Sequence, residues 1–455
     1  MINKYKNFYF EEFSFDLNSK TALFKYSFDK EVFFEEKIYF LDNNFKLREN
    51  LDINIINNIL FSISIVIGIS YYKIFPCQNL VVNTGFLDEK QIEFFKKFYI
   101  NGLGEFLFRN NINPSGLFNF VNNSKKIYKK IEFKTSEKYI VPVGGGKDSI
   151  VSIELLKSFN KEFDLFTFSS NDNLLYENTT KNSGKNRLFI KRELSKNILE
   201  VIKNGGYNGH VPITGIIAFV LELISYLYDY KYIVLSNELS ANFGNTNFFG
   251  VEVNHQWSKG YEFEKSFGDY IKDNISSEVK YFSLLRPMYE LKIAQIFAKV
   301  GKKYFNNFSS CNTNFKIFKD LENKKNNYWC NSCPKCLFVF IILSAFLEKK
   351  EIINIFKENL FEKKELLNLF EELVGISGIK PFECVGTNKE VILALKMIYD
   401  KKEFNDTFML DIFKKEVLSK MTRNDFILLE NEILTLNLEN NLIPKDLIEL
   451  IKDYE

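Results

Sequence analysis

Histidine is scarce in this 455-residue chain, and neither sign of charge dominates it. The sequence holds only two histidines, His210 and His255, and its 60 lysines and arginines almost match its 58 aspartates and glutamates, for a formal net charge of +2. Such a balance is not typical of a nucleic-acid scaffold or a membrane-surface protein. We therefore expect neither nucleic acid nor a membrane among its partners.

The chain also lacks an apolar run that is both long enough and free enough of charge to indicate a membrane span. Its most apolar windows are 59–72, 211–228 and 337–347. The first and third are shorter than the ~18–20 residues that a span requires, and the second carries Glu222. The first residues alternate aromatic with charged side chains and show no signal-peptide core. We expect three buried helices and a cytoplasmic protein.

Cysteine is too rare and too clustered for a secreted disulfide scaffold, because four of the six cysteines lie close together. They follow the spacing C-x18-C-x2-C-x2-C, at Cys311, Cys330, Cys333 and Cys336. Four thiolates suit tetrahedral Zn²⁺, and two-residue gaps let a tight turn present successive sulfurs to one ion. An iron–sulfur cluster and a redox C-x-x-C pair are the alternatives. We favour a structural zinc site in a reducing compartment.

The texture of the chain divides it into three parts. The first forty residues alternate with period two and are followed by helical patterns, which predicts an α+β domain over 1–130. A lysine-rich passage, 123–138, is predicted to be a linker or an exposed strand, with a basic substrate-facing strip as the alternative. Residues 131–347 alternate β-rich runs with helices, and residues 348–455 are mostly helical. The predicted fold class is α/β, with a parallel sheet and right-handed crossovers in the central part.

Individual elements follow from the same patterns. In the first part we expect helices from Ile53 to about Phe75 and from Asp88 to Ile100. In the central part we expect strands at 139–143, 163–170 and 232–237, and helices at 148–159, 187–204 and 214–229.

A glycine-rich loop joins the first of these central strands to a helix. It reads G-G-G-K-D-S, from Gly144 to Ser149. Glycines let the backbone approach an anion, and the helix N-terminus directs N–H groups and a partial positive charge toward it. The order of residues fits neither G-x-x-x-x-G-K-[ST] nor G-x-G-x-x-G. A phosphate site of another kind is therefore predicted, with a turn that binds nothing as the alternative.

The loop resembles the S-G-G-x-D-S signature of the PP-loop ATP pyrophosphatases, which hold the pyrophosphate of ATP while AMP is transferred. The resemblance implies a Rossmann-like sheet of the adenine nucleotide alpha-hydrolase type. It also implies that ATP contacts Gly144, Gly145, Gly146, Lys147, Asp148 and Ser149, that Asp148 helps to hold Mg²⁺, and that the Lys147 ammonium is free to neutralise developing charge. This sequence departs from the signature at Gly144, where the family has serine.

Polar residues gather in the stretch from 204 to 290, where a purely structural chain would not need them. Glu238 follows a predicted strand, so we expect it at the carboxyl edge of the sheet, where ligands bind in open α/β folds. His255, Lys259, Glu262 and Glu264 come next and could close over that edge, although an exposed charged helix face is the alternative. We expect His210 to be either a hydrogen-bonded structural residue or a catalyst.

Taken together, "VPVGGGKDS", "GHVPITG", "SNELSA", "NHQWSK", "YEFE", "LRPMYE", "FSSCN", "WCNSCPKC", "KPFECVGT" and "GISYYK" resemble one family, the ATP-dependent UDP-N-acetylmuramoyl-L-alanyl-L-glutamate epimerases of peptidoglycan synthesis. The resemblance implies a small-molecule substrate, a UDP-muramoyl dipeptide whose terminal L-glutamate is inverted. It also implies consumption of ATP with Mg²⁺ and release of AMP and pyrophosphate.

Inversion of an amino acid requires a base on one face of the α-carbon and an acid on the other. Adenylation of the neighbouring carboxylate makes the α-proton acidic enough to remove. His255 suits either role at neutral pH, and Cys384 suits proton transfer if its thiolate is accessible. A small buried core residue is the alternative for Cys384. Glu238, Glu383 and Lys259 also remain candidates, and the sequence does not pair them.

Two other classes of protein fit part of these patterns. A 7-cyano-7-deazaguanine synthase-like or tRNA-modifying PP-loop enzyme would keep ATP and zinc but adenylate a nucleobase or another substrate. The balanced charge and the absence of a basic RNA-binding module in the first 130 residues argue against the tRNA version. A non-catalytic nucleotide-binding module would not need the polar residues that follow the sheet.

Overall fold

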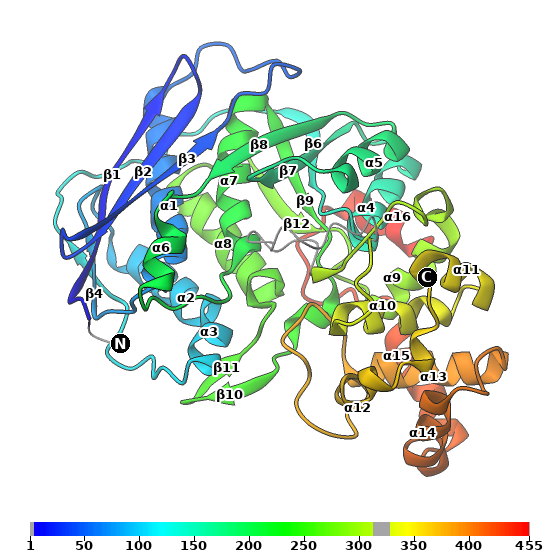
Figure 1. Ribbon diagram of the computed structural model, residues 1–455. Helices are drawn as coiled ribbons and strands as arrows, with labels where there is room; N and C mark the ends of the chain where they lie inside the picture. Colours follow the sequence, from blue (N-terminus) through cyan, green and yellow to red (C-terminus); the bar gives the residue numbers. More distant parts are fainter. Residues whose placement is uncertain (1–3, 313–327, 455) are drawn as a thin grey trace.

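One ten-stranded sheet runs through the computed structural model, which describes residues 4–312 and 328–454 (Figure 1). Its strand order is β12-β9-β6-β7-β8-β3-β2-β1-β4-β5. The strands are β1 (Asn7–Asp16), β2 (Thr21–Phe28), β3 (Val32–Tyr39), β4 (Asn79–Val82), β5 (Asn119–Asn122), β6 (Ser136–Pro142), β7 (Phe163–Ser169), β8 (Arg187–Glu193), β9 (Tyr230–Leu235) and β12 (Lys280–Ser283). A separate hairpin pairs β10 (Thr246–Phe248) with β11 (Val251–Val253).

Parallel pairing dominates this sheet. Strands β12, β9, β6, β7 and β8 run parallel, and so do β1, β4 and β5. Between these groups β8, β3, β2 and β1 pair antiparallel. The predicted antiparallel opening and parallel centre are both confirmed, and they belong to one sheet. The predicted domain boundary near residue 130 stays a prediction.

A buried ion pair fixes the junction where β8 meets β3. Ile38 lies opposite Arg192 in the ladder. The Arg192 Nε donates to Glu36 Oε1 at 2.7 Å, and the Tyr71 hydroxyl donates to Glu36 Oε2 at 2.7 Å. Because both charges are buried and their polar atoms are hydrogen-bonded, the antiparallel and parallel groups of strands are held in one register.

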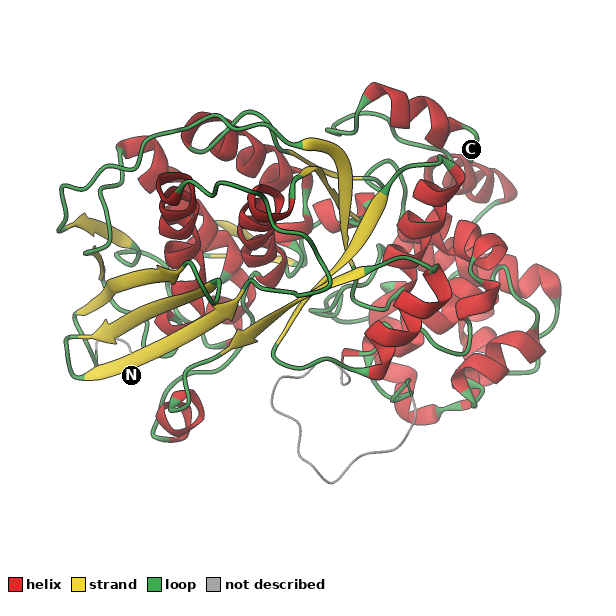
Figure 2. Cartoon of the chain, turned by 90° about the horizontal axis from the view of Figure 1, so that it is seen from above, coloured by secondary structure: helices red, strands yellow, loops and turns green. Residues whose placement is uncertain are grey.

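Helices cover the sheet and form the last third of the chain. The helices are α1 (Ile53–Tyr72), α2 (Glu89–Gly102), α3 (Gly104–Arg109), α4 (Lys147–Ser158), α5 (Leu174–Ser183), α6 (Ile198–Lys203), α7 (Ile213–Tyr228), α8 (Tyr261–Asn274), α9 (Glu290–Val300), α10 (Pro334–Ser344), α11 (Lys349–Phe356), α12 (Leu367–Val374), α13 (Asn388–Lys401), α14 (Phe408–Glu416), α15 (Arg423–Leu434) and α16 (Lys445–Lys452). Figure 2 shows most of the C-terminal helices gathered on the side opposite to strands β1–β3. The predicted helical character of residues 348–455 is confirmed.

The length and composition of helix α1 would allow it to cross a membrane. It contains 20 residues, and 83% of its most apolar window is buried inside the protein. It packs against α7 and strand β1. A mostly buried helix of this kind is what the core of a globular fold requires. The helix predicted from Ile53 is thus confirmed, with a length that the narrower apolar window did not reveal.

The prediction of a helix over 187–204 is wrong in its first half. Residues Arg187–Glu193 form strand β8, and only Ile198–Lys203 are helical. Buried and less buried side chains alternate along β8, which is the period of a strand between two neighbours. The local sequence pattern suits either a helix or a strand, and pairing with β7 and β3 stabilises the strand.

Candidate active site

The glycine loop connects β6 to α4, as the sequence predicts. Gly145 has φ +75°, and a Cβ there would lie 2.4 Å from the Leu175 side chain, so only glycine fits. A Cβ on Gly146, the N-cap of α4, would lie 2.7 Å from the Ser310 hydroxyl. At Gly144 a Cβ would meet nothing within 4 Å. The departure from the resembled signature therefore leaves open space, and the neighbouring glycines keep a tight turn.

Lys147 and Asp148 begin α4 and join a buried network of charges. The Lys147 ammonium is completely buried and contacts the carboxylates of both Asp148 and Glu290. The Lys335 ammonium donates to the other Glu290 oxygen at 3.1 Å. Burial alone would raise the pKa of Glu290, but the two ammonium groups lower it to about 2. Lys147 is therefore paired with two carboxylates here, and its role toward developing charge stays a prediction.

Glu238 lies at the carboxyl end of β9, where we expected it. It is buried, and its Oε1 atom has no hydrogen-bond partner among the described residues. Burial raises its pKa, Lys259 opposes this effect, and Glu290 and Asp148 add to it. Glu238 therefore has an oxygen available for a ligand, with the carboxylates of Asp148 and Glu290 and the Lys259 ammonium near it.

A fully buried arginine fixes the backbone around Glu238 and Lys259. The Arg286 Nη1 donates to the Glu238 carbonyl at 2.7 Å, and its Nη2 donates to the Lys259 carbonyl at 2.5 Å. The same guanidinium pairs with Glu264 at 2.7 Å. Glu264 is therefore a buried structural residue. The alternative prediction of an exposed helix face is wrong at this residue.

Both histidines meet at one carboxylate. His255 follows the β10–β11 hairpin, and its Nδ1 lies 2.5 Å from Glu105 Oε2. The His210 Nδ1 lies 3.5 Å from the same oxygen, and the two imidazole rings are 4.5 Å apart. Glu105 reaches them because α3 packs directly against β11. These three groups lie close enough for a metal, but nearby Lys73 and Arg109 make the surroundings unfavourable for a cation.

Cys384 lies in the segment between α12 and α13. The preceding backbone is held by Asn245, whose side-chain amide donates to the carbonyl groups of Lys380 and Pro381 at 3.2 and 3.0 Å. The Phe382 ring packs against Phe108 of α3, with ring centres 5.3 Å apart. These contacts bring a distant part of the chain to the histidines.

The Cys384 sulfur lies between two cationic side chains. The Lys259 ammonium donates to it at 3.3 Å, and His255 interacts with it by hydrogen bonding. Burial alone would raise the pKa of Cys384, but Lys259 and then His255 lower it to about 6. Burial alone would lower the pKa of His255, but Cys384 and Glu105 raise it to about 9. Near neutral pH the pair is thus a thiolate and an imidazolium.

Lys259 connects this pair to the glycine loop. Burial would lower its pKa, but Cys384, Glu238 and Asp148 together raise it. The Lys335 ammonium, which contacts Glu290 in the loop network, also donates to the Cys384 carbonyl. The glycine loop, the Glu238 carboxylate and the thiolate–imidazolium pair therefore form one continuous site.

The four predicted metal ligands also come together. Their sulfur atoms lie within 4.8 Å of one another, at Cys311, Cys330, Cys333 and Cys336. The Cys330–Cys336 and Cys333–Cys336 sulfur distances are 3.6 and 3.5 Å. Thiolates around tetrahedral zinc are separated by about 3.8 Å, given Zn–S bonds of ~2.3 Å. The cluster is therefore compatible with structural zinc.

The catalytic candidates His255, Cys384, Glu238 and Lys259 thus share one site, and Glu383 lies beside them. Burial raises the pKa of Glu383 to about 7. Glu105, Glu290 and Lys335 also belong to this site, although the sequence alone does not single them out. Glu290 and Lys335 occur in the quoted motifs "LRPMYE" and "WCNSCPKC", which was a usable signal. Glu105 had no local signal.

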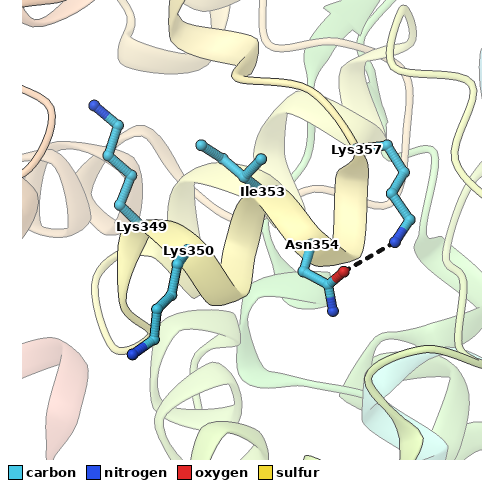
Figure 3. Close-up of a pocket in the computed structure, with 5 residues that line it drawn as sticks. All are labelled: Lys349, Lys350, Ile353, Asn354 and Lys357. Carbon is cyan, nitrogen blue, oxygen red and sulfur yellow. Dashed lines mark hydrogen bonds between the residues drawn. The ribbon is translucent and has the colours of Figure 1, made fainter.

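A hollow on another face does not belong to this site. Figure 3 shows it on α11, where Lys349, Lys350, Ile353, Asn354 and Lys357 point to different sides of the helix. The one contact drawn among them joins the Lys357 ammonium to Asn354 Oδ1 at 3.0 Å. Its lining lacks the acids and thiols of the site around Cys384.

Two family models match most of this chain. The family model of the MurL N-terminal domain matches residues 1–284, and that of the MurL C-terminal domain matches residues 307–426. A protein of Xanthomonas oryzae pv. oryzae, named UDP-N-acetyl-alpha-D-muramoyl-L-alanyl-L-glutamate epimerase, is 33% identical over 361 residues, covering 79% of each chain.

Two further relatives carry the same name. The protein of Salinispora tropica is 32% identical over 403 residues, which cover 88% of this chain and 86% of the relative. The protein of a Micromonospora species is 32% identical over 403 residues and 88% of each chain. Because the first family model alone spans more than half of the sequence and these relatives match most of it, the chain belongs to the MurL family.

Proposed function

We propose that this protein is an ATP-dependent epimerase that inverts the terminal L-glutamate of UDP-N-acetylmuramoyl-L-alanyl-L-glutamate to D-glutamate in peptidoglycan precursor synthesis. The observation that carries the proposal is the pairing of Cys384 with His255, one ready to accept a proton and the other ready to donate one. An epimerase needs this combination at the start of each turnover. The names of the relatives supply the substrate.

The glycine loop supplies the activation step in this proposal. An oxygen of the substrate's α-carboxylate attacks the α-phosphorus of ATP, and pyrophosphate leaves. The N–H groups at the start of α4, together with Ser149, would bind the departing phosphates. Mg²⁺ held by Asp148 and Glu238 would neutralise phosphate charge. The resulting acyl-adenylate lacks the carboxylate charge that otherwise makes the α-proton hard to remove.

Cys384 and His255 then exchange protons with the α-carbon. The thiolate takes the α-proton from one face, and the imidazolium donates a proton to the other face. Lys259 stabilises the thiolate before transfer, and Glu105 keeps the His255 ring oriented. Water finally cleaves the acyl-adenylate to the carboxylate and AMP. The direct interaction between Cys384 and His255 lets the pair regain its starting protonation state after product release.

The proposal also covers the domain organisation, the metal and the location of the protein. We propose a Rossmann-like PP-loop unit over 131–347, flanked by an α+β domain over 1–130 and a helical region over 348–455. The four clustered cysteines would hold structural zinc at the end of that unit. Unpaired thiols in this number fit a reducing compartment, so we propose a cytoplasmic location.

The test is to incubate the protein with Mg-ATP and UDP-N-acetylmuramoyl-L-alanyl-L-glutamate, and to measure AMP and the configuration of glutamate. We expect both AMP and D-glutamate. Absence of both would overturn the proposal. Release of AMP only with a deazapurine precursor or tRNA would instead favour a nucleobase-directed enzyme.

Asp148→Asn tests whether proton removal depends on the activation step. We expect AMP formation and solvent deuterium uptake at the α-carbon to fall together, each by at least about 100-fold, because activation precedes proton removal. Normal AMP formation in this variant would remove Asp148 from the ATP site.

A further inference from the structure

Lys73 is a buried cation without a carboxylate partner among residues 4–312 and 328–454. It follows α1, it is 7% exposed, and its ammonium donates only to neutral oxygens, the Asn208 side chain at 3.3 Å and the Gly209 carbonyl. Burial is the main cause that lowers its pKa to about 8. A buried charge left in this state is costly unless an anion joins it.

Arg109 is a second cation with unused donors in the same place. Its Nε donates to Glu105 Oε1 at 2.5 Å, and its guanidinium lies over the Phe382 ring at 5.0 Å. In the described part of the chain its two Nη groups have no hydrogen-bond partner. The side chain is 56% exposed, so a ligand can reach it. A guanidinium held at Nε presents its remaining N–H groups in the geometry that suits a carboxylate.

His210 lies between these two cations and the reacting pair. Lys73 donates to the residue before it. Burial is the main cause of the low pKa of the His210 ring, and His255, Lys73 and Arg109 add to it. On its other side the ring packs against His255. Arg109 and the His255 imidazolium share one carboxylate, Glu105, and Lys73 adds a third positive charge near His210.

We propose that Lys73 and Arg109 bind the side-chain carboxylate of the substrate's glutamate. The inference rests on the proposed function, in which the α-carboxylate is adenylated and the side-chain carboxylate keeps its charge. That carboxylate is three bonds from the α-carbon, which exchanges protons with Cys384 and His255. The cations beyond His210 hold it in place while the α-carbon inverts, and they make the site selective for glutamate over glutamine.

The test compares two substrates in each variant, UDP-N-acetylmuramoyl-L-alanyl-L-glutamate and the same compound ending in L-glutamine. We expect wild-type kcat/KM to favour glutamate strongly. In Arg109→Gln and in Lys73→Gln that preference falls at least about 10-fold, because a charge-assisted contact to the carboxylate is lost. The loss arises mainly through KM for glutamate, and Arg109→Lys recovers part of it. Arg423→Gln on α15 and Lys272→Gln on α8, both exposed, are matched controls that keep the wild-type preference.

The outcomes separate this inference from the proposed function. If wild-type protein inverts glutamate and both variants fold but keep the wild-type preference for glutamate, the inference is overturned and the proposed function stands. If wild-type protein forms neither AMP nor D-glutamate, both fail. Thermal unfolding of each variant identifies a change that disrupts folding. In that case Arg109→Lys and Lys73→Arg supply the comparison, because both retain a cation of different shape.

Discussion

Cys384 and the four clustered cysteines carry the same thiol in two opposite environments. Around Cys384 the nearest groups are the Lys259 ammonium and the His255 imidazole, so a single thiolate is surrounded by positive charge. In the cluster all four sulfurs lie within 4.8 Å of one another. The first environment stabilises one exchangeable proton acceptor, and the second requires a cation at its centre.

Sequence spacing identifies the four-cysteine cluster but not the environment of Cys384. Repeated two-residue gaps bring thiols together wherever the rest of the chain goes, so the metal cluster is visible in the sequence. Cys384 becomes special only through Lys259 and His255, which lie more than a hundred residues away. Substitutions at Cys384 and in the cluster should therefore have different effects.

Cys384→Ala removes the proposed proton acceptor. We expect solvent deuterium uptake at the substrate α-carbon to fall by about 10²–10⁴-fold, the usual size of a general acid–base contribution. AMP formation continues, because the glycine loop is intact, and the metal content of the four-cysteine cluster is unchanged. Deuterium uptake is measured by mass spectrometry of the recovered dipeptide. Uptake at the wild-type rate would show that Cys384 is a packing residue.

Cys311→Ser acts on the other side of the comparison. Loss of one of four thiolates opens the coordination shell, and a structural zinc contributes on the order of 10 kcal/mol to folding. We expect most of the metal to be lost, together with a large drop in thermal stability. Elemental analysis and thermal unfolding measure both, with Cys384→Ser as the matched control that keeps its metal. Full metal occupancy in Cys311→Ser would contradict the ligand set, and visible absorption in wild-type protein would identify an iron–sulfur cluster.

The parts of the site that are local in sequence could be predicted, and those that depend on tertiary contact could not. The glycine loop, Asp148 and the four cysteines each lie within a short motif whose spacing fixes its geometry. Glu105 meets His255 only because α3 packs on the β10–β11 hairpin, and the intervening 150 residues give no sign of it.

The fold follows the same rule. Strands β1 to β3 and helices α4 and α7 could be predicted from the spacing of their apolar residues along the sequence. The segment that became β8 mixes charged and apolar residues in a way that suits either element, and its place between β7 and β3 made it a strand. Very short strands such as β4 and β12 carry too few residues for a period to be read.

The pH dependence of Cys384 distinguishes a thiolate held by cations from an ordinary thiol. Since its pKa is lowered to about 6, alkylation by iodoacetamide should accelerate about 10-fold between pH 5 and pH 7 and then level off. The free enzyme's kcat/KM should rise with Cys384 ionisation and fall as His255, with a pKa of about 9, loses its proton. Groups facing the pair include Lys259, Glu105 and Glu383. The site of alkylation is found by peptide mass spectrometry, and a rate that keeps rising to pH 9 would refute the lowered pKa.

Cys77 gives the smallest effect and supplies the reference for both environments. It is buried in the core near the end of α1, and its Sγ donates to the Asn79 carbonyl at 3.6 Å. Burial is the main cause that raises its pKa to about 12, so it stays a neutral thiol. We expect Cys77→Ala to lower the free energy of unfolding by about 1 kcal/mol, through lost packing and one weak hydrogen bond, as measured by urea denaturation. Metal content and deuterium uptake should both stay at wild-type values. If Cys77→Ala instead slowed deuterium uptake as much as Cys384→Ala, the charged neighbours of Cys384 would not be what sets it apart.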